Sequence, residues 1–209
     1  MIDCSTIDVE TARAVAAAAK DAGFDMLDAP VSGGVAGAEA ASLTFMVGGQ
    51  SGGFSRAQPV LGAMGRTIVH AGPFGNGQAA KICNNMILGV SMIAVCEAFA
   101  LAERLGLEAQ KLFEISSKSS GQCWALTSYC PVPGPVPAAP ANRDYAPGFT
   151  AAMMLKDLRL AQQAAGATAA ATPLGAAAAN LYQLFVEGGA GSLDFSGIYR
   201  FLHKSQSKI

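Results

Sequence analysis

The longest helical stretch in this sequence constrains the fold more than any other feature. Residues 78–105 predict one continuous helix of about 28 residues, which would be about 42 Å long and would cross a whole domain. The run between Lys81 and Glu97 is apolar, but it is shorter than the roughly 20 residues that a membrane crossing requires. We therefore expect a soluble helix and no membrane partner.

The first third of the chain alternates between short strand and helix patterns. Ser5–Asp8 is a capping signal for a helix at Val9–Ala22, and Gly23 follows as the residue that ends this helix. The remaining patterns predict strands at Phe24–Leu27, Leu43–Val47 and Thr67–His70, and a helix at Phe54–Met64. Alternation at this spacing predicts an α/β layer with a partly parallel sheet.

Beyond the glycine-rich turn at Gly72–Gly77 the patterns are helical. After the long helix we expect helices at Glu108–Ser116, Thr150–Ala165, Pro173–Val186 and Asp194–His203. A proline-rich stretch at Gly121–Gly148 interrupts this series, and a loop of that length is usually functional or disordered. The sequence thus predicts an α/β part at residues 1–73 and an all-helical domain at residues 74–209, with the long helix near 78–105 between them.

Charge and cysteine content exclude several classes of function. The chain has 14 Lys and Arg and 15 Asp and Glu, so no basic excess is present to bind nucleic acid. Its five cysteines are widely spaced and only two histidines accompany them, which supports neither a metal site nor a disulfide framework. We expect reduced thiols and a cytoplasmic protein. The low charged fraction, 14%, predicts surfaces that another subunit or domain covers.

Three small residues after a predicted strand form the first candidate site. Ser32, Gly33 and Gly34 directly follow Pro30 and Val31. Glycines let backbone N–H groups converge on an anion, and Ser32 adds a hydroxyl donor, so a substrate carboxylate fits there. The alternative is a strand-to-helix turn that needs glycine for conformational reasons alone.

A lysine and an asparagine on the long helix form the second candidate site. Lys81 and Asn85 are four residues apart and share a helix face that continues through Leu88 and Met92. An ammonium on an apolar, packed face loses hydration, which suits it to proton transfer near neutral pH. The alternative is a lysine that reaches solvent near the start of the helix.

Residues around the long loop form a third, weaker group. Lys156 and Asp157 lie on a predicted helix soon after Phe149, and such a pair is most often a solvated face. Trp124, the only tryptophan, begins the loop; it either walls a pocket or anchors helix packing. No G-x-G-x-x-G fingerprint joins a strand to a helix in this sequence.

Together these segments resemble the β-hydroxyacid dehydrogenases, along nearly the whole chain. Asp28–Gly34 is similar to the family's substrate-binding motif, and Gly75–Asn85 is similar to its catalytic motif. Pro131–Gly134, followed by Phe149 and Lys156–Leu158, resembles the stretch that separates the 3-hydroxyisobutyrate enzymes from tartronate semialdehyde reductases.

The resemblance implies an activity and a cofactor. It implies NAD-dependent oxidation of 3-hydroxyisobutyrate to methylmalonate semialdehyde in valine catabolism, by a homo-oligomer, dimer or tetramer. Lys81 would be the general base, and Asn85 would orient the substrate hydroxyl.

The resemblance also assigns binding residues. Ser32, Gly33 and Gly34 would hold the carboxylate, and we add Trp124 as a substrate contact. Thr6, Phe149 and Lys156 would contact NAD.

This sequence departs from the family in two respects. The resemblance implies a partial Rossmann-type domain, because the half with the glycine fingerprint is not in this sequence. Weak NAD affinity is therefore expected. Ala41 stands where the family usually has glycine, which predicts an altered turn.

Two alternative functions stay open: a non-catalytic oligomerisation module, and a tartronate semialdehyde reductase.

Overall fold

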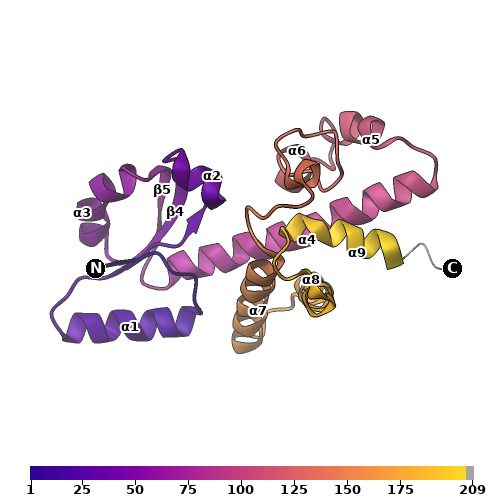
Figure 1. Cartoon of the computed structure of the whole chain (residues 1–209). Coiled ribbons are helices and arrows are strands. Elements are labelled where there is room, and N and C mark those ends of the chain that lie inside the picture. Colours follow the sequence, from indigo (N-terminus) through magenta and orange to yellow (C-terminus); the bar gives the residue numbers. More distant parts are fainter. Residues whose placement is uncertain (206–209) are drawn as a thin grey trace. The chain divides into compact units, whose positions relative to one another are not determined.

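The computed structural model describes residues 1–205, which form two compact units (Figure 1). One unit contains Met1–Asn85 together with Leu160–Ala171. The other contains Met86–Arg159 and the chain from Thr172 on. The predicted fold class, an α/β part followed by an all-helical part, is confirmed.

The α/β unit is built on one five-stranded sheet. Its strands are β1 (Ile2–Asp3), β2 (Leu27–Asp28), β3 (Val31–Ser32), β4 (Leu43–Gly48) and β5 (Gly65–Gly72). β1 pairs parallel with β2, and β4 pairs parallel with β5, whereas β2 and β3 both run antiparallel to β4. The helices are α1 (Val9–Asp21), α2 (Gly34–Glu39) and α3 (Ser51–Gly62). A small apolar cluster that includes Phe45, Val47 and Leu61 forms the core of this unit.

The predicted boundaries of α1 are confirmed by its capping geometry. The carboxylate of Asp8 accepts a hydrogen bond from the Thr11 N–H at 2.8 Å, which satisfies one of the unpaired donors of the first turn. Gly23 adopts a φ of +80° after the helix, and the Phe24 N–H donates to the carbonyl of Ala19. A glycine with positive φ and this returning bond ends a helix in the Schellman manner.

Three elements of the sheet region differ from the sequence prediction. The strand expected at Phe24–Leu27 is β2 at Leu27–Asp28, and Phe24 itself is exposed. The short strand β3 and the helix α2 were not predicted, because Pro30 and the neighbouring glycines have the composition of a turn. Ala41, flagged for its missing glycine, adopts a φ of +48° just after α2.

The long helix α4 (Asn76–Arg104) starts two residues before its predicted boundary, and its part from Met86 on belongs to the helical unit. The other elements are α5 (Ala109–Ser116), α6 (Trp124–Thr127), η1 (Pro140–Arg143), α7 (Ala151–Thr168), α8 (Pro173–Phe185), η2 (Val186–Ala190), η3 (Phe195–Gly197) and α9 (Ile198–Ser205). Met92 and Cys96 of α4 pack with Leu158 of α7 and Tyr182 of α8 in the core.

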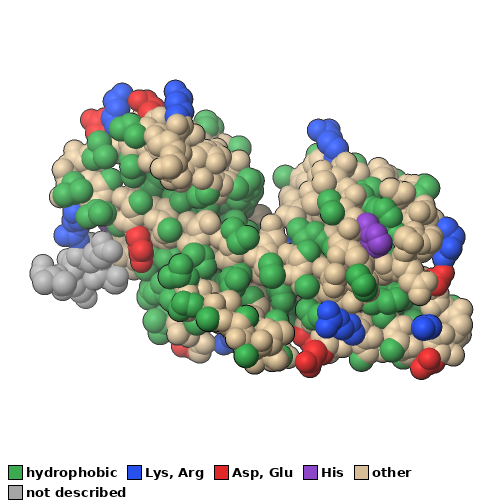
Figure 2. Space-filling view, turned by 180° about the vertical axis from the view of Figure 1, so that it is seen from behind, with side chains coloured by type: hydrophobic (Ala, Val, Ile, Leu, Met, Phe, Trp, Pro, Cys, Tyr) green, Lys and Arg blue, Asp and Glu red, His purple; other side chains and the backbone are tan. Residues whose placement is uncertain are grey.

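Among residues 1–205, α4 is the only helix that is long and apolar enough to cross a membrane by length and composition alone. Half of its most apolar window is buried in the protein, and its buried residues belong to the core of the helical unit. That burial is the pattern of a core helix. The described surface also carries many exposed apolar side chains (Figure 2), including Ile87 and Leu101 on α4 and Leu105 directly after it.

The proline-rich loop is more ordered than its composition predicts. It contains α6 and η1, and Asn142 bridges it by accepting from the Gly134 N–H and donating to the Val136 carbonyl, both at 2.8 Å. The buried Tyr145 hydroxyl donates to the carbonyl of Pro131 at 2.7 Å. These local bonds satisfy backbone groups that lack a helix or sheet partner.

Candidate functional site

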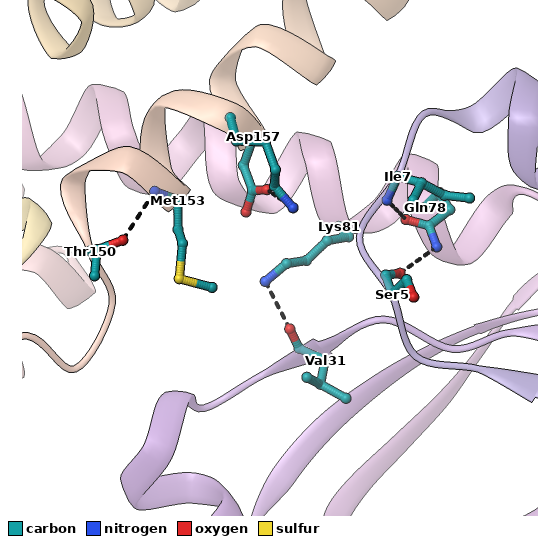
Figure 3. A network of polar contacts seen from close by, with 9 residues as sticks. Ser5, Ile7, Val31, Gln78, Lys81, Thr150, Met153 and Asp157 are labelled. Atoms are coloured by element: carbon teal, nitrogen blue, oxygen red, sulfur yellow. Dashed lines mark hydrogen bonds and ion pairs between the residues drawn. The ribbon is translucent and has the colours of Figure 1, made fainter. Parts of the chain in front are cut away.

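Lys81 is buried and its ammonium is held by the sheet. The side chain is 7% exposed, and Nζ donates to the main-chain carbonyl of Val31 at 2.7 Å (Figure 3). Of the two interpretations of Lys81, a buried group or a solvent-exposed one, the structure supports burial. Because a carbonyl oxygen accepts from a neutral amine as well as from an ammonium, this bond holds Nζ in place in either protonation state.

The loop of Ser32, Gly33 and Gly34 starts at the residue that binds Lys81. Val31 and Ser32 form β3, and Gly33 and Gly34 then adopt φ values of +138° and +61° at the start of α2. The φ of Gly33 requires glycine there, and an added side chain would also crowd Leu43 Cδ2 at 3.0 Å. The two sequence motifs, 31–34 and 81–85, therefore lie side by side within the α/β unit.

Asn85 lies one helical turn after Lys81 and is 2% exposed. Its Oδ1 accepts a hydrogen bond from Asn84 Nδ2 at 3.0 Å. A side-chain amide whose oxygen is bound in this way has its orientation fixed, with two N–H donors on the other side.

Asp28 is a residue of the site region whose role the sequence analysis missed. Its buried carboxylate accepts from the Gly75 N–H and from the Gln78 N–H, both at 2.9 Å, and so caps the start of α4. Gly77 lies so close that an added Cβ would be 2.6 Å from the Asp28 carbonyl. The capping residue is about 50 positions away in sequence, so no local capping pattern could reveal it.

Gln78 fixes the segment that contains Thr6. Its side chain is fully buried; Oε1 accepts from the Ile7 N–H at 3.2 Å, and Nε2 donates to the Ser5 carbonyl at 2.8 Å (Figure 3). The two bonds bracket Thr6, which is half-buried in the turn between β1 and α1. In α/β sheets, ligands bind beyond the carboxyl ends of the parallel strands, where this turn lies.

Lys156 and Asp157 differ sharply in exposure. Their side chains are 50% and 3% exposed, and Lys156 Nζ lies 3.2 Å from Asp157 Oδ1. The solvated-face interpretation therefore fits Lys156 but is wrong for Asp157. Asp157 shares the buried stripe of α7 with Met154 and Ala161, and that helical spacing is the sequence signal that could have identified it.

Trp124 and Phe149 belong to one line of aromatic rings in the helical unit. Trp124, which is 52% exposed, stacks on Tyr129 with ring centroids 4.8 Å apart. Tyr129 stacks on Phe195, and Phe195 and Phe149 form a T-shaped pair with ring centroids 5.8 Å apart. Burial, followed by the neighbouring Asp194, raises the pKa of the Tyr129 phenol above its usual value, so the hydroxyl remains a donor at neutral pH.

Metal and thiol chemistry have little support at these positions. Among residues 1–205 no group of three or more His, Cys, Asp or Glu is placed to hold a metal ion. Cys4 lies two residues before Thr6, and partial burial, then Asp3, raises the pKa of its thiol. A thiol that is protonated at neutral pH is a poor nucleophile.

Two family models match consecutive parts of the chain. Residues 1–72 match the NAD binding domain of 6-phosphogluconate dehydrogenase, and residues 75–202 match the model described as NAD-binding of NADP-dependent 3-hydroxyisobutyrate dehydrogenase. Both are models of NAD-binding domains, which confirms the predicted cofactor class.

Curated relatives and a solved structure agree with this assignment. The chain is 55% identical over 96% of its length to a probable 3-hydroxyisobutyrate dehydrogenase of Mycobacterium tuberculosis, of which it covers 68%. It is 51% identical over its full length to an NAD-dependent L-serine dehydrogenase of Pseudomonas aeruginosa, of which it covers 70%. The solved structure of the M. tuberculosis 3-hydroxyisobutyrate dehydrogenase with L-serine superposes with a TM-score of 0.93 at 54% identity, over 96% of this chain and 69% of that one.

Proposed function

Because this chain belongs to the 3-hydroxyisobutyrate dehydrogenase family, we propose that it catalyses the NAD-dependent oxidation of 3-hydroxyisobutyrate to methylmalonate semialdehyde. Lys81 acts as the general base. In metabolism this is a step of valine catabolism.

One contact carries the proposal: the 2.7 Å hydrogen bond from Lys81 Nζ to the Val31 carbonyl. It places the only buried lysine among residues 1–203 at the residue that precedes the loop of Ser32, Gly33 and Gly34. A carboxylate bound by that loop brings the rest of a short hydroxy acid near Nζ. Oxidation of a hydroxy acid is helped by a site that holds the carboxylate and by a base that reaches the hydroxyl.

The protein groups divide the chemistry as follows. In the neutral form Lys81 donates one N–H to Val31 and keeps a lone pair that takes the proton of the substrate hydroxyl. The C–O bond becomes a carbonyl as a hydride leaves the same carbon. Asn85 donates an amide N–H to the substrate oxygen. In the reverse direction the Lys81 ammonium returns the proton.

The residues assigned to NAD have suitable chemistry for it. NAD, when bound, supplies the acceptor for the hydride. Thr6 would hold it with a hydroxyl, Lys156 with an ammonium suited to phosphate oxygens, and Phe149 with an aromatic face. The hydrogen bonds of Gln78 on either side of Thr6 support this fit. They require a polar side chain to be buried, which packing alone does not need, and they hold the Thr6 segment in place.

L-serine is a second candidate substrate. The P. aeruginosa relative is named an L-serine dehydrogenase, and the solved M. tuberculosis structure contains L-serine. L-serine and 3-hydroxyisobutyrate share a carboxylate and a primary hydroxyl, and they differ at carbon 2, which carries an ammonium or a methyl group. The same anion loop and the same base therefore serve both acids.

A substrate panel tests the proposal directly. NADH formation is measured by absorbance with 3-hydroxyisobutyrate and with L-serine, and NADH consumption is measured with tartronate semialdehyde in the reverse direction. We expect the highest kcat/KM with 3-hydroxyisobutyrate and a lower value with L-serine. A preference for tartronate semialdehyde would favour the reductase alternative. A folded, oligomeric chain that forms no NADH with any substrate would overturn the proposal and favour the oligomerisation module.

The remaining assignments are proposals of the same kind. The division into residues 1–73 and 74–209, a homo-oligomer and a cytoplasmic location rest on the sequence patterns and on the family. Light scattering of the purified chain tests the oligomer, for which we expect a dimer or tetramer.

A further inference from the structure

Asp194 is a buried carboxylate with an unusual number of hydrogen-bond donors. It is 0% exposed and accepts five hydrogen bonds. Oδ1 accepts from the N–H and the hydroxyl of Ser196, at 3.0 and 2.7 Å. Oδ2 accepts from the Tyr129 hydroxyl at 2.9 Å and from the N–H groups of Gly148 and Phe149 at 3.0 and 3.2 Å.

The two oxygens of Asp194 have different structural roles. The bonds of Oδ1 cap the start of η3, which is an ordinary local role for an aspartate. The three donors on Oδ2 come from residues 45 to 65 positions earlier, at the beginning and end of the proline-rich loop. Local capping does not explain them. Oδ2 ties the ends of that loop to one point in the helical unit.

The same carboxylate forms hydrogen bonds to two residues of the line of aromatic rings. It binds Tyr129, on which Trp124 stacks, and it binds the backbone of Phe149. Phe195, the next residue in the chain, is the ring between them, 5.3 Å from Tyr129 and 5.8 Å from Phe149. One buried group thus binds both Tyr129 and the backbone of Phe149, in a stack whose outer ring, Trp124, is half exposed.

We propose that Asp194 is a positioning residue: through Oδ2 it holds Trp124 and Phe149 at a fixed separation, and so sets substrate affinity without touching the substrate. The inference rests on the proposed function, in which Trp124 contacts substrate and Phe149 contacts NAD. The Tyr129 hydroxyl is the link to Trp124, because the Tyr129 ring supports the indole. No ion pair to Asp194 is seen in residues 1–203, so the carboxylate depends on these donors for its stability.

Trp124 is the only tryptophan, so its fluorescence reports on the stack alone. Acrylamide quenching of Trp124 is compared in the unaltered chain and in Tyr129→Phe, Asp194→Asn and Ser196→Ala. Tyr129→Phe keeps the ring and removes one bond to Oδ2, and Ser196→Ala is its matched control on Oδ1. We expect the first two changes to raise the quenching constant, by at most about twofold because Trp124 is already 52% exposed, and Ser196→Ala to leave it unchanged. Equal quenching in all four proteins, or an equal rise in Ser196→Ala, would overturn the proposal.

Substrate affinity is the second readout. It is measured as the dissociation constant of 3-hydroxyisobutyrate from the change in Trp124 emission, with circular dichroism confirming the fold. We expect binding to be about tenfold weaker in Tyr129→Phe and unchanged in Ser196→Ala. If the unaltered chain binds but Tyr129→Phe binds equally well, the positioning role is refuted. If the unaltered chain shows no response to substrate, the proposed function fails, and the quenching comparison still decides whether Asp194 holds the stack. If Asp194→Asn does not fold, Tyr129→Phe carries both readouts.

Discussion

Replacing Gln78 with methionine should loosen the Thr6 segment at a predictable cost. Methionine has a similar length and no polar atoms, so the core at this fully buried position stays filled. The Ser5 carbonyl and the Ile7 N–H both lose their partners, at 2.8 and 3.2 Å. Each bond is part-buried, so water replaces some of the lost interaction, and we expect each to cost about 1 kcal/mol.

The total expected loss is about 2 kcal/mol in the free energy of unfolding. It is measured from the midpoint of urea unfolding at constant slope. Gln110→Met is the matched control, because Gln110 is an exposed residue of α5 whose side chain bonds Glu114 at 3.3 Å. Its change should stay within about 0.5 kcal/mol. Amide exchange at Ile7 should also become faster in Gln78→Met, with exchange in α5 unchanged.

The stabilising role of the two Gln78 hydrogen bonds would be refuted if Gln78→Met unfolded at the same urea concentration as the unaltered chain. Faster exchange throughout the α/β unit, and not locally at Ile7, would contradict the specific role of Gln78 at Thr6.

Three further predictions concern backbone strain, close packing and pH. Ala41→Gly should raise the free energy of unfolding by about 0.5–1 kcal/mol, because alanine is strained at a φ of +48°; a loss of stability would contradict this. Gly77→Ala should lower it by about 3 kcal/mol, since the new Cβ would be 2.4 Å from the Met46 carbonyl; unfolding at the same denaturant concentration as the unaltered chain would refute that packing. Burial raises the pKa of every tyrosine above 10: Tyr129, Tyr145, Tyr182, Tyr199. The stability that these phenols contribute is therefore complete below pH 10 and is lost as the pH rises further. Tyrosinate absorbance should increase together with unfolding, and ionisation near pH 10 in a folded chain would contradict this prediction.

Local patterns were sufficient to predict most of the helices. The range predicted for α4 and the limits of α1 agree with the structure within a few residues, because caps, glycine ends and helical periodicity are properties of neighbouring residues. β3 was missed because two residues between Pro30 and a pair of glycines form a strand only through pairing with β4. A pairing partner more than ten residues away leaves no signal in a short window.

In the candidate site, too, features set by neighbouring residues were predicted and features set by distant partners were not. The Lys81 and Asn85 pair was visible from helical spacing, and its burial is now established. The long-range bonds of Asp28 and Asp194 were not predicted, because their donors lie about 50 residues away in sequence. Gln78 was part of the catalytic motif, but its bonds across Thr6 depend on how α4 meets the first turn. Long-range hydrogen bonding of buried polar groups is fixed by the fold.

Substitution of Lys81 tests the central claim most directly. Single-turnover NADH formation from 3-hydroxyisobutyrate is compared in the unaltered chain and in Lys81→Ala, with substrate binding followed separately by Trp124 fluorescence. The account predicts that Lys81→Ala still binds substrate but forms NADH about 10²- to 10⁴-fold more slowly, and that an added alkylamine restores part of the rate. NADH formation at an undiminished rate in Lys81→Ala would contradict the account.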